Sequence, residues 1–72
     1  MTKITFSAYE TPNSTHRISD GMESVWFAWP DGVDEDEVCG QYEDGYDHNG
    51  SSADVDAVIY SMDGEPVMSW TF

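Results

Sequence analysis

The chain has 72 residues, which is room for one domain with a thin hydrophobic core. Its 39% hydrophobic content includes three Trp, four Tyr and three Phe. Disordered acidic tails lack such residues, so we expect one folded domain over residues 1–72. Fifteen acidic residues oppose Lys3 and Arg17 alone, for a formal net charge of -13. Such a surface repels nucleic acid and anionic membranes, which excludes direct binding of either and favours a basic partner.

Cysteine content and leader signals limit the class of protein further. Cys39 is the single cysteine, so an intramolecular disulfide and a multi-cysteine metal site are excluded. Residues 1–5 carry no basic region followed by an apolar core. The longest apolar run, 25–29, is too short to cross a bilayer. A cytoplasmic location is therefore expected.

Turn signals recur along the chain. Five of the six glycines follow Asp or Asn, in pairs that supply the positive φ of tight turns. The pairs are Asp20-Gly21, Asp31-Gly32, Asp44-Gly45, Asn49-Gly50 and Asp63-Gly64. Turns this frequent leave short segments between them, which is typical of an antiparallel sheet.

The first two predicted strands precede residue 30. Apolar Ile4, Phe6 and Ala8 alternate with polar residues, which predicts a half-buried strand over 4–8. The run 23–29 is rich in aromatic and β-branched residues and ends at a proline, which predicts a second strand.

The segment 31–54 has two interpretations. Four acids at 34–37 precede Val38, an arrangement that suits the first turn of a helix, where carboxylates meet the positive end of the dipole. Asp is a poor residue for a helix interior, however, and Gly40 is expected to stop the helix early. A single short helix and an irregular acidic loop both remain open.

The last part of the chain predicts a hairpin. Residues 55–62 and 67–72 flank Asp63-Gly64, a strong short-range hairpin signal. In the second of these strands the face with Trp70 is expected to be the core face. The sequence therefore predicts an α+β fold that is mainly antiparallel β, a small sheet of four or five strands with at most one short helix.

The clustering of acids is the main functional signal. Residues 31–47 hold eight carboxylates and no base, whereas ordinary surfaces mix both signs. Asp54 and Asp56 are alternate residues, roughly 6.6 Å apart if both lie in a strand, a spacing that can imitate successive phosphates. The candidate partner-binding residues are Asp31, Asp34, Glu35, Asp36, Glu37, Glu43, Asp44, Asp47, Asp54 and Asp56.

These features carry a resemblance. In its short length, extreme acidity, scarcity of bases, aromatic content and sheet-rich pattern, the whole chain resembles the small DNA-mimic inhibitors of phages and mobile elements. That group includes anti-CRISPR proteins, anti-restriction proteins and uracil-DNA glycosylase inhibitors. The resemblance rests on composition and size, so it transfers no residue role. It implies a viral, anti-CRISPR-like inhibitor that occupies the basic nucleic-acid groove of a host protein in the host cytoplasm, as a monomer or a homodimer.

Two other binding classes remain open. Excess carboxylates also keep proteins of halophiles in solution at high salt, although this does not explain the clustering in 31–47. Asp47, Asn49 and Ser51 alternate like the start of a calcium loop, but Val58 stands where a bidentate Glu is required. A weak Ca²⁺ site among Glu43, Asp44 and Asp47 is the remaining form of that hypothesis, and no cofactor is otherwise expected.

An enzyme is not expected. His16 and His48 stand alone in polar contexts that predict solvated side chains. Acids flank Cys39 and raise its pKa, which disfavours a nucleophile. Trp26, Trp29 and Trp70 are expected in the core rather than in a ligand site.

Overall fold

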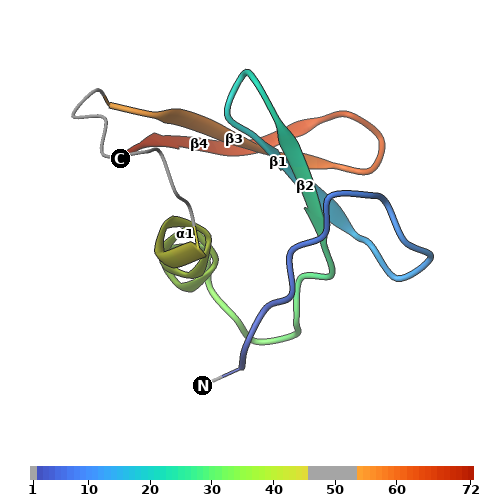
Figure 1. Cartoon of the computed structure of the whole chain (residues 1–72). Coiled ribbons are helices and arrows are strands. Elements are labelled where there is room, and N and C mark those ends of the chain that lie inside the picture. Colours follow the sequence, from blue (N-terminus) through green and yellow to red (C-terminus); the bar gives the residue numbers. More distant parts are fainter. Residues whose placement is uncertain (1, 46–53) are drawn as a thin grey trace.

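The computed structural model describes residues 2–45 and 54–72. It is an α+β fold in which one helix lies against one face of a four-stranded antiparallel sheet (Figure 1). The strands follow the order β2-β1-β3-β4 across the sheet. The elements are β1 His16–Ser19, β2 Ser24–Phe27, α1 Glu35–Gly45, β3 Asp56–Ser61 and β4 Pro66–Thr71. The predicted fold class is confirmed.

The predicted C-terminal hairpin is confirmed. β3 and β4 pair antiparallel with Ile59 opposite Met68, and the register shifts between Ile59 and Tyr60. Gly64 has φ 88° in the connecting turn, where a side chain would be strained. Trp70 is half-buried against the core and its strand neighbours are exposed, so the face expected to be buried is the buried one.

The first hairpin joins β1 to β2 and was only half predicted. β2 lies inside the predicted run 23–29, whereas no strand was predicted at the position of β1. In the turn, an Asp20 carboxylate oxygen accepts hydrogen bonds from the backbone N–H groups of Met22 and Glu23, at 2.9 and 2.8 Å. Gly21 supplies the positive φ of 91°.

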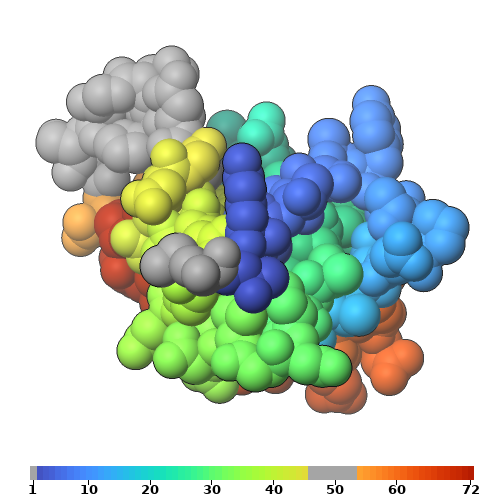
Figure 2. All heavy atoms as spheres, turned by 90° about the horizontal axis from the view of Figure 1, so that it is seen from below, coloured from blue at the N-terminus to red at the C-terminus, as the bar shows by residue number. Residues whose placement is uncertain are grey.

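The predicted strand over residues 4–8 is wrong. These residues join the sheet only at Ser7, whose N–H and C=O pair with the backbone of Trp26 at 2.9 Å each. Earlier in the segment, the Gln41 side chain forms the backbone hydrogen bonds that a neighbouring strand would otherwise form. Its Oε1 accepts from the Ile4 N–H and its Nε2 donates to the Thr2 carbonyl, both at 2.7 Å. The amide therefore holds the N-terminal segment beside the helix (Figure 2).

The acidic segment forms a helix, α1, which is longer than expected. It continues through Gly40, and Asp44-Gly45 is its last turn rather than a separate tight turn. Its buried residues are Val38, Cys39 and Tyr42, which lie on one side of the helix at i, i+1 and i+4. Burial of this side outweighs the roughly 1 kcal/mol that a helical glycine costs.

Aromatic rings connect the helix to the rest of the core. Tyr42 makes edge contacts with Phe6, Trp70 and Phe72, with ring centroids 5.8, 5.8 and 5.9 Å away. The Trp70 indole N–H also donates to a Glu43 carboxylate oxygen at 2.9 Å. These contacts hold α1 with one fixed side toward the sheet.

Replacing Gly40 by alanine is expected to stabilise the fold. The Gly40 backbone is helical and an added Cβ meets no atom within 4 Å, so the free energy of unfolding should rise by about 0.5–1 kcal/mol in urea titrations. As a control, Gly64→Ala should lower it by about 1–2 kcal/mol because of its positive φ. Loss of stability in Gly40→Ala would contradict the helix through residue 40.

Candidate functional site

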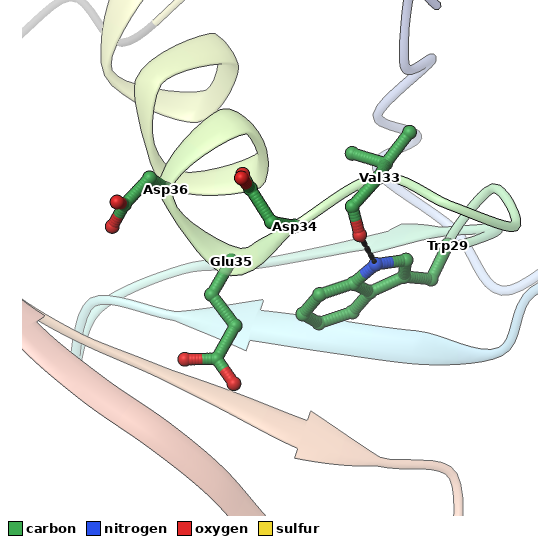
Figure 3. Close-up of a pocket in the computed structure, with 5 residues that line it drawn as sticks. All are labelled: Trp29, Val33, Asp34, Glu35 and Asp36. Carbon is green, nitrogen blue, oxygen red and sulfur yellow. Dashed lines mark hydrogen bonds between the residues drawn. The ribbon is translucent and has the colours of Figure 1, made fainter.

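The carboxylates of the candidate site gather at the start of α1. Asp31 lies in the preceding turn, and Glu35 to Glu37 form the first helical turn. The acids within 31–36 are exposed, and Glu37 is half-buried. Figure 3 shows the carboxylates of Asp34, Glu35 and Asp36 directed away from one another. The arrangement offers several separate negative groups to a large partner rather than one convergent site for a small ion.

Asp34 has a structural role within this group. Its Oδ1 accepts a hydrogen bond from the Glu37 backbone N–H at 2.9 Å, so Asp34 is the N-cap of α1. Acids at the next three positions are favourable there because the helix dipole is positive at this end. The first turn is therefore acidic for a local structural reason.

The last turn of α1 carries two further acids and no base. An anion at this end opposes the helix dipole. Glu43 gains the hydrogen bond from Trp70, whereas Asp44 is exposed and shares only a shallow hollow with Lys3. Among the carboxylates of α1, Asp44 is therefore the one whose presence a contribution to stability explains least.

The other predicted site residues do not extend this group. Asp54 is exposed and precedes β3. Asp56 alternates with buried Ala57, so it projects from the sheet face opposite α1, where it accepts a hydrogen bond from the Thr71 hydroxyl. Asp56 thus does not join the carboxylates of α1, and Asp47 lies outside the described residues.

An open hollow of about 450 Å³ adjoins the acidic turn (Figure 3). It is lined by Trp29, Val33, Asp34, Glu35 and Asp36. The Trp29 indole N–H donates to the Val33 carbonyl at 2.7 Å, which fixes the ring at one side of the hollow. An aromatic face beside carboxylates suits a guanidinium or ammonium group. Trp29 packs on the core as expected, but its position beside the acids was not predicted.

The prediction of a solvated His16 is wrong. His16 lies in β1 with its ring 5.7 Å from that of Phe27 and 4.9 Å from that of Trp29, measured between centroids. Burial lowers the pKa of the imidazole below its ordinary 6.5. Thr15 Oγ1 accepts a hydrogen bond from the backbone N–H of Trp29 and lies 2.7 Å from His16 Nδ1. This arrangement lets the hydroxyl donate to a neutral ring. His48 lies outside the described residues.

The pKa of the Cys39 thiol is raised, as its acidic neighbours predicted. Burial, and then the charges of Glu43, Asp36 and Glu35, raise its pKa to about 11. The thiolate, which is the nucleophilic form, is therefore almost absent at neutral pH.

The described residues form neither a metal-binding cluster nor a membrane-spanning helix. Within 2–45 and 54–72, no three His, Cys, Asp or Glu side chains are placed to hold a metal ion together. The calcium hypothesis included Asp47, which lies outside those ranges. No helix in the same ranges combines the length and hydropathy that a membrane span requires.

Comparison with known proteins does not assign this chain to a class of protein. No protein-family model, curated protein or solved structure matches this chain.

The half-buried His16 predicts a specific pH dependence of stability. The unfolded chain binds the His16 proton near pH 6.5 and the folded chain only at lower pH, so the free energy of unfolding rises with pH in this interval. The stability that the neutral ring contributes is complete above pH 6.5 and is lost as the pH falls through the lowered pKa. Between about pH 7.5 and about pH 5.5, His16→Gln should lose less stability in urea titrations than the parent. Equal losses in both proteins would show that His16 does not titrate with unfolding.

Proposed function

We propose that this protein is a binding inhibitor, rather than an enzyme, that uses the acidic side of α1 to occupy the basic nucleic-acid groove of another protein. The observation that carries the proposal is the group of carboxylates on α1, exposed except for the half-buried Glu37, that form no structural hydrogen bond. Asp34 caps the helix and Glu43 binds Trp70. Glu35, Asp36, Glu37 and Asp44 have no such role among the described contacts.

The cost of these charges supports a binding role. With a net charge of -13, self-repulsion opposes the compact state. Asp44 also stands at the end of the helix where the dipole disfavours an anion. Carboxylates that reduce stability are more readily explained when they bind a partner protein. The side chains that bind carboxylates best are Arg and Lys.

The mechanism follows from electrostatics. The negative field of α1 attracts a basic groove over a range of about 10 Å at 0.1 M salt and accelerates encounter. At contact, Arg and Lys of the partner form charge-assisted hydrogen bonds with the carboxylates. The hollow beside Trp29 offers one aromatic face to a cation from the same groove. While α1 fills the groove, DNA or RNA is excluded from it, and the anti-CRISPR-like class is the one that composition and size favour.

Removing the four carboxylates that have no structural hydrogen bond is expected to weaken binding to the partner. The variant Glu35→Gln, Asp36→Asn, Glu37→Gln, Asp44→Asn keeps the Asp34 cap and the Glu43–Trp70 hydrogen bond. A partner captured from a bacterial lysate by the parent should bind this variant with an association rate about tenfold slower or more, and with a shallower salt dependence. Surface plasmon resonance at two salt concentrations measures both, and duplex DNA should compete with the parent for the partner.

A second variant provides a matched control. Glu10→Gln, Glu23→Gln, Asp63→Asn and Glu65→Gln remove the same four charges from loops and turns away from α1, so this protein should bind nearly as the parent does. Equal loss in both variants, or simultaneous binding of DNA and this protein to the partner, would contradict the proposal. All proteins are first checked by circular dichroism at about 0.15 M salt. A parent that is unfolded there and folds only near 2 M salt would instead support halophilic adaptation.

A further inference from the structure

The sheet face opposite α1 is uncovered by any described helix or strand (Figure 1). Side chains alternate along each strand, and Ile18, Phe27 and Ile59 point into the core. Their strand neighbours Arg17, Trp26 and Tyr60 therefore project from the other side. The prediction that Trp26 lies in the core is wrong. Arg17 is opposite both Trp26 and Tyr60 in the register, so the three form one row across three strands.

This row is ordered in the single chain. The Arg17 guanidinium lies over the Tyr60 ring, with its Cζ 4.4 Å from the ring centroid. One guanidinium nitrogen donates to Ser24 Oγ at 2.9 Å. A guanidinium has five N–H donors, so further donors are left for an acceptor outside the chain. Trp, Tyr and Arg are the residues that contribute most often to the centre of protein interfaces.

The strands of the open face carry few carboxylates. Of the fifteen acidic residues, fourteen belong to the described part of the chain, since Asp47 lies outside it. Asp56 is the one of these that belongs to a strand. The others lie in α1, in turns and in loops, so two copies that meet through their open faces keep most of their negative charge apart.

The two charges of the open face are complementary under two-fold symmetry. Asp56 precedes Tyr60 by four residues on β3, which places it about 13 Å along the strand from the level of Arg17. The Ser19–Val58 pair lies midway between them. A two-fold axis in the plane of the interface, crossing the face at this pair, sets Arg17 of each copy against Asp56 of the other. Such an isologous contact forms both ion pairs at once.

We propose that the open sheet face binds a second copy of this chain through two reciprocal Arg17–Asp56 pairs. The face measures roughly 15–20 Å in each direction, so two copies cover roughly 450–800 Å² in total, less than the roughly 1,200 Å² of a standard specific interface. The dimer is therefore weak and concentration-dependent. The dimer places the two α1 helices on opposite outer sides. It therefore presents two separate acidic surfaces rather than one continuous one, and it is independent of the proposed function of α1.

Sedimentation velocity from about 20 µM to about 1 mM tests the dimer. The sedimentation coefficient of the parent should rise with concentration, and more so at about 0.5 M salt, because salt screens the repulsion between two chains of charge -13. Binding of a basic partner through α1 should weaken under the same change, so the two proposals fail independently. A parent that is monomeric throughout both series overturns the dimer and leaves the face to a different protein.

A charge exchange tests the pairing itself. Arg17→Glu and Asp56→Arg should each reduce dimerisation at least tenfold, because each sets like charges against one another. The double variant Arg17→Glu, Asp56→Arg restores both pairs with reversed sign and should recover most of the association. Glu10→Arg makes the same change of charge as Asp56→Arg in a distant loop and should not weaken the dimer. If the folded double variant stays monomeric, the proposed pairing is wrong.

Discussion

Tyr42 occupies the place where the N-terminal segment, the helix and the last strand meet. Its ring has an edge contact with Phe6, with Trp70 and with Phe72. A domain of this size has a thin core, and offset or edge contacts between rings add about 0.5–1.5 kcal/mol each beyond the buried area. The orientation of α1 depends on this one side chain more than on any local helix preference, since the helix contains a central glycine and ends in acids.

The charge distribution follows from that orientation. Because Val38, Cys39 and Tyr42 face the sheet, Asp36 and Asp44 are left on the outer part of the helix, where both are exposed. The sheet meanwhile keeps its second face almost free of acids. One helix on one side of one sheet thus separates a strongly negative surface from a nearly neutral aromatic one, and the two proposals assign each surface to a different kind of partner.

Local signals predicted the parts of the fold that local chemistry determines. Asp63-Gly64 fixed the last hairpin through its turn geometry, and the acids at 34–37 indicated a helix start through capping and the dipole. The strand predicted over 4–8 failed because Gln41, 37 positions from Ile4, supplies hydrogen bonds that alternation does not reveal. β1 was missed because it is four residues long and has one fully buried side chain, Ile18.

The candidate site was predictable to the same extent. Carboxylates close together in sequence on α1 are close together in space, because a helix keeps neighbours within a turn. Asp56 was expected beside them, but the alternation of β3 places it on the opposite face, beside Thr71. The hollow beside Trp29 depends on the path of residues 30–34 between β2 and α1, and periodicity carries no information about such a path.

The most direct test of this account is an NMR titration of the ¹⁵N-labelled protein with a short arginine–serine peptide as a basic probe. If the acidic side of α1 is the surface that receives cations, amide shifts should cluster in residues 34–44 and at the Trp29 indole. The turns that hold Glu23, Asp63 and Glu65 should respond much less, although they are also acidic. Shifts spread equally over α1 and these turns would contradict the account. Cations would then bind to negative charge anywhere on the surface, with no preference for α1.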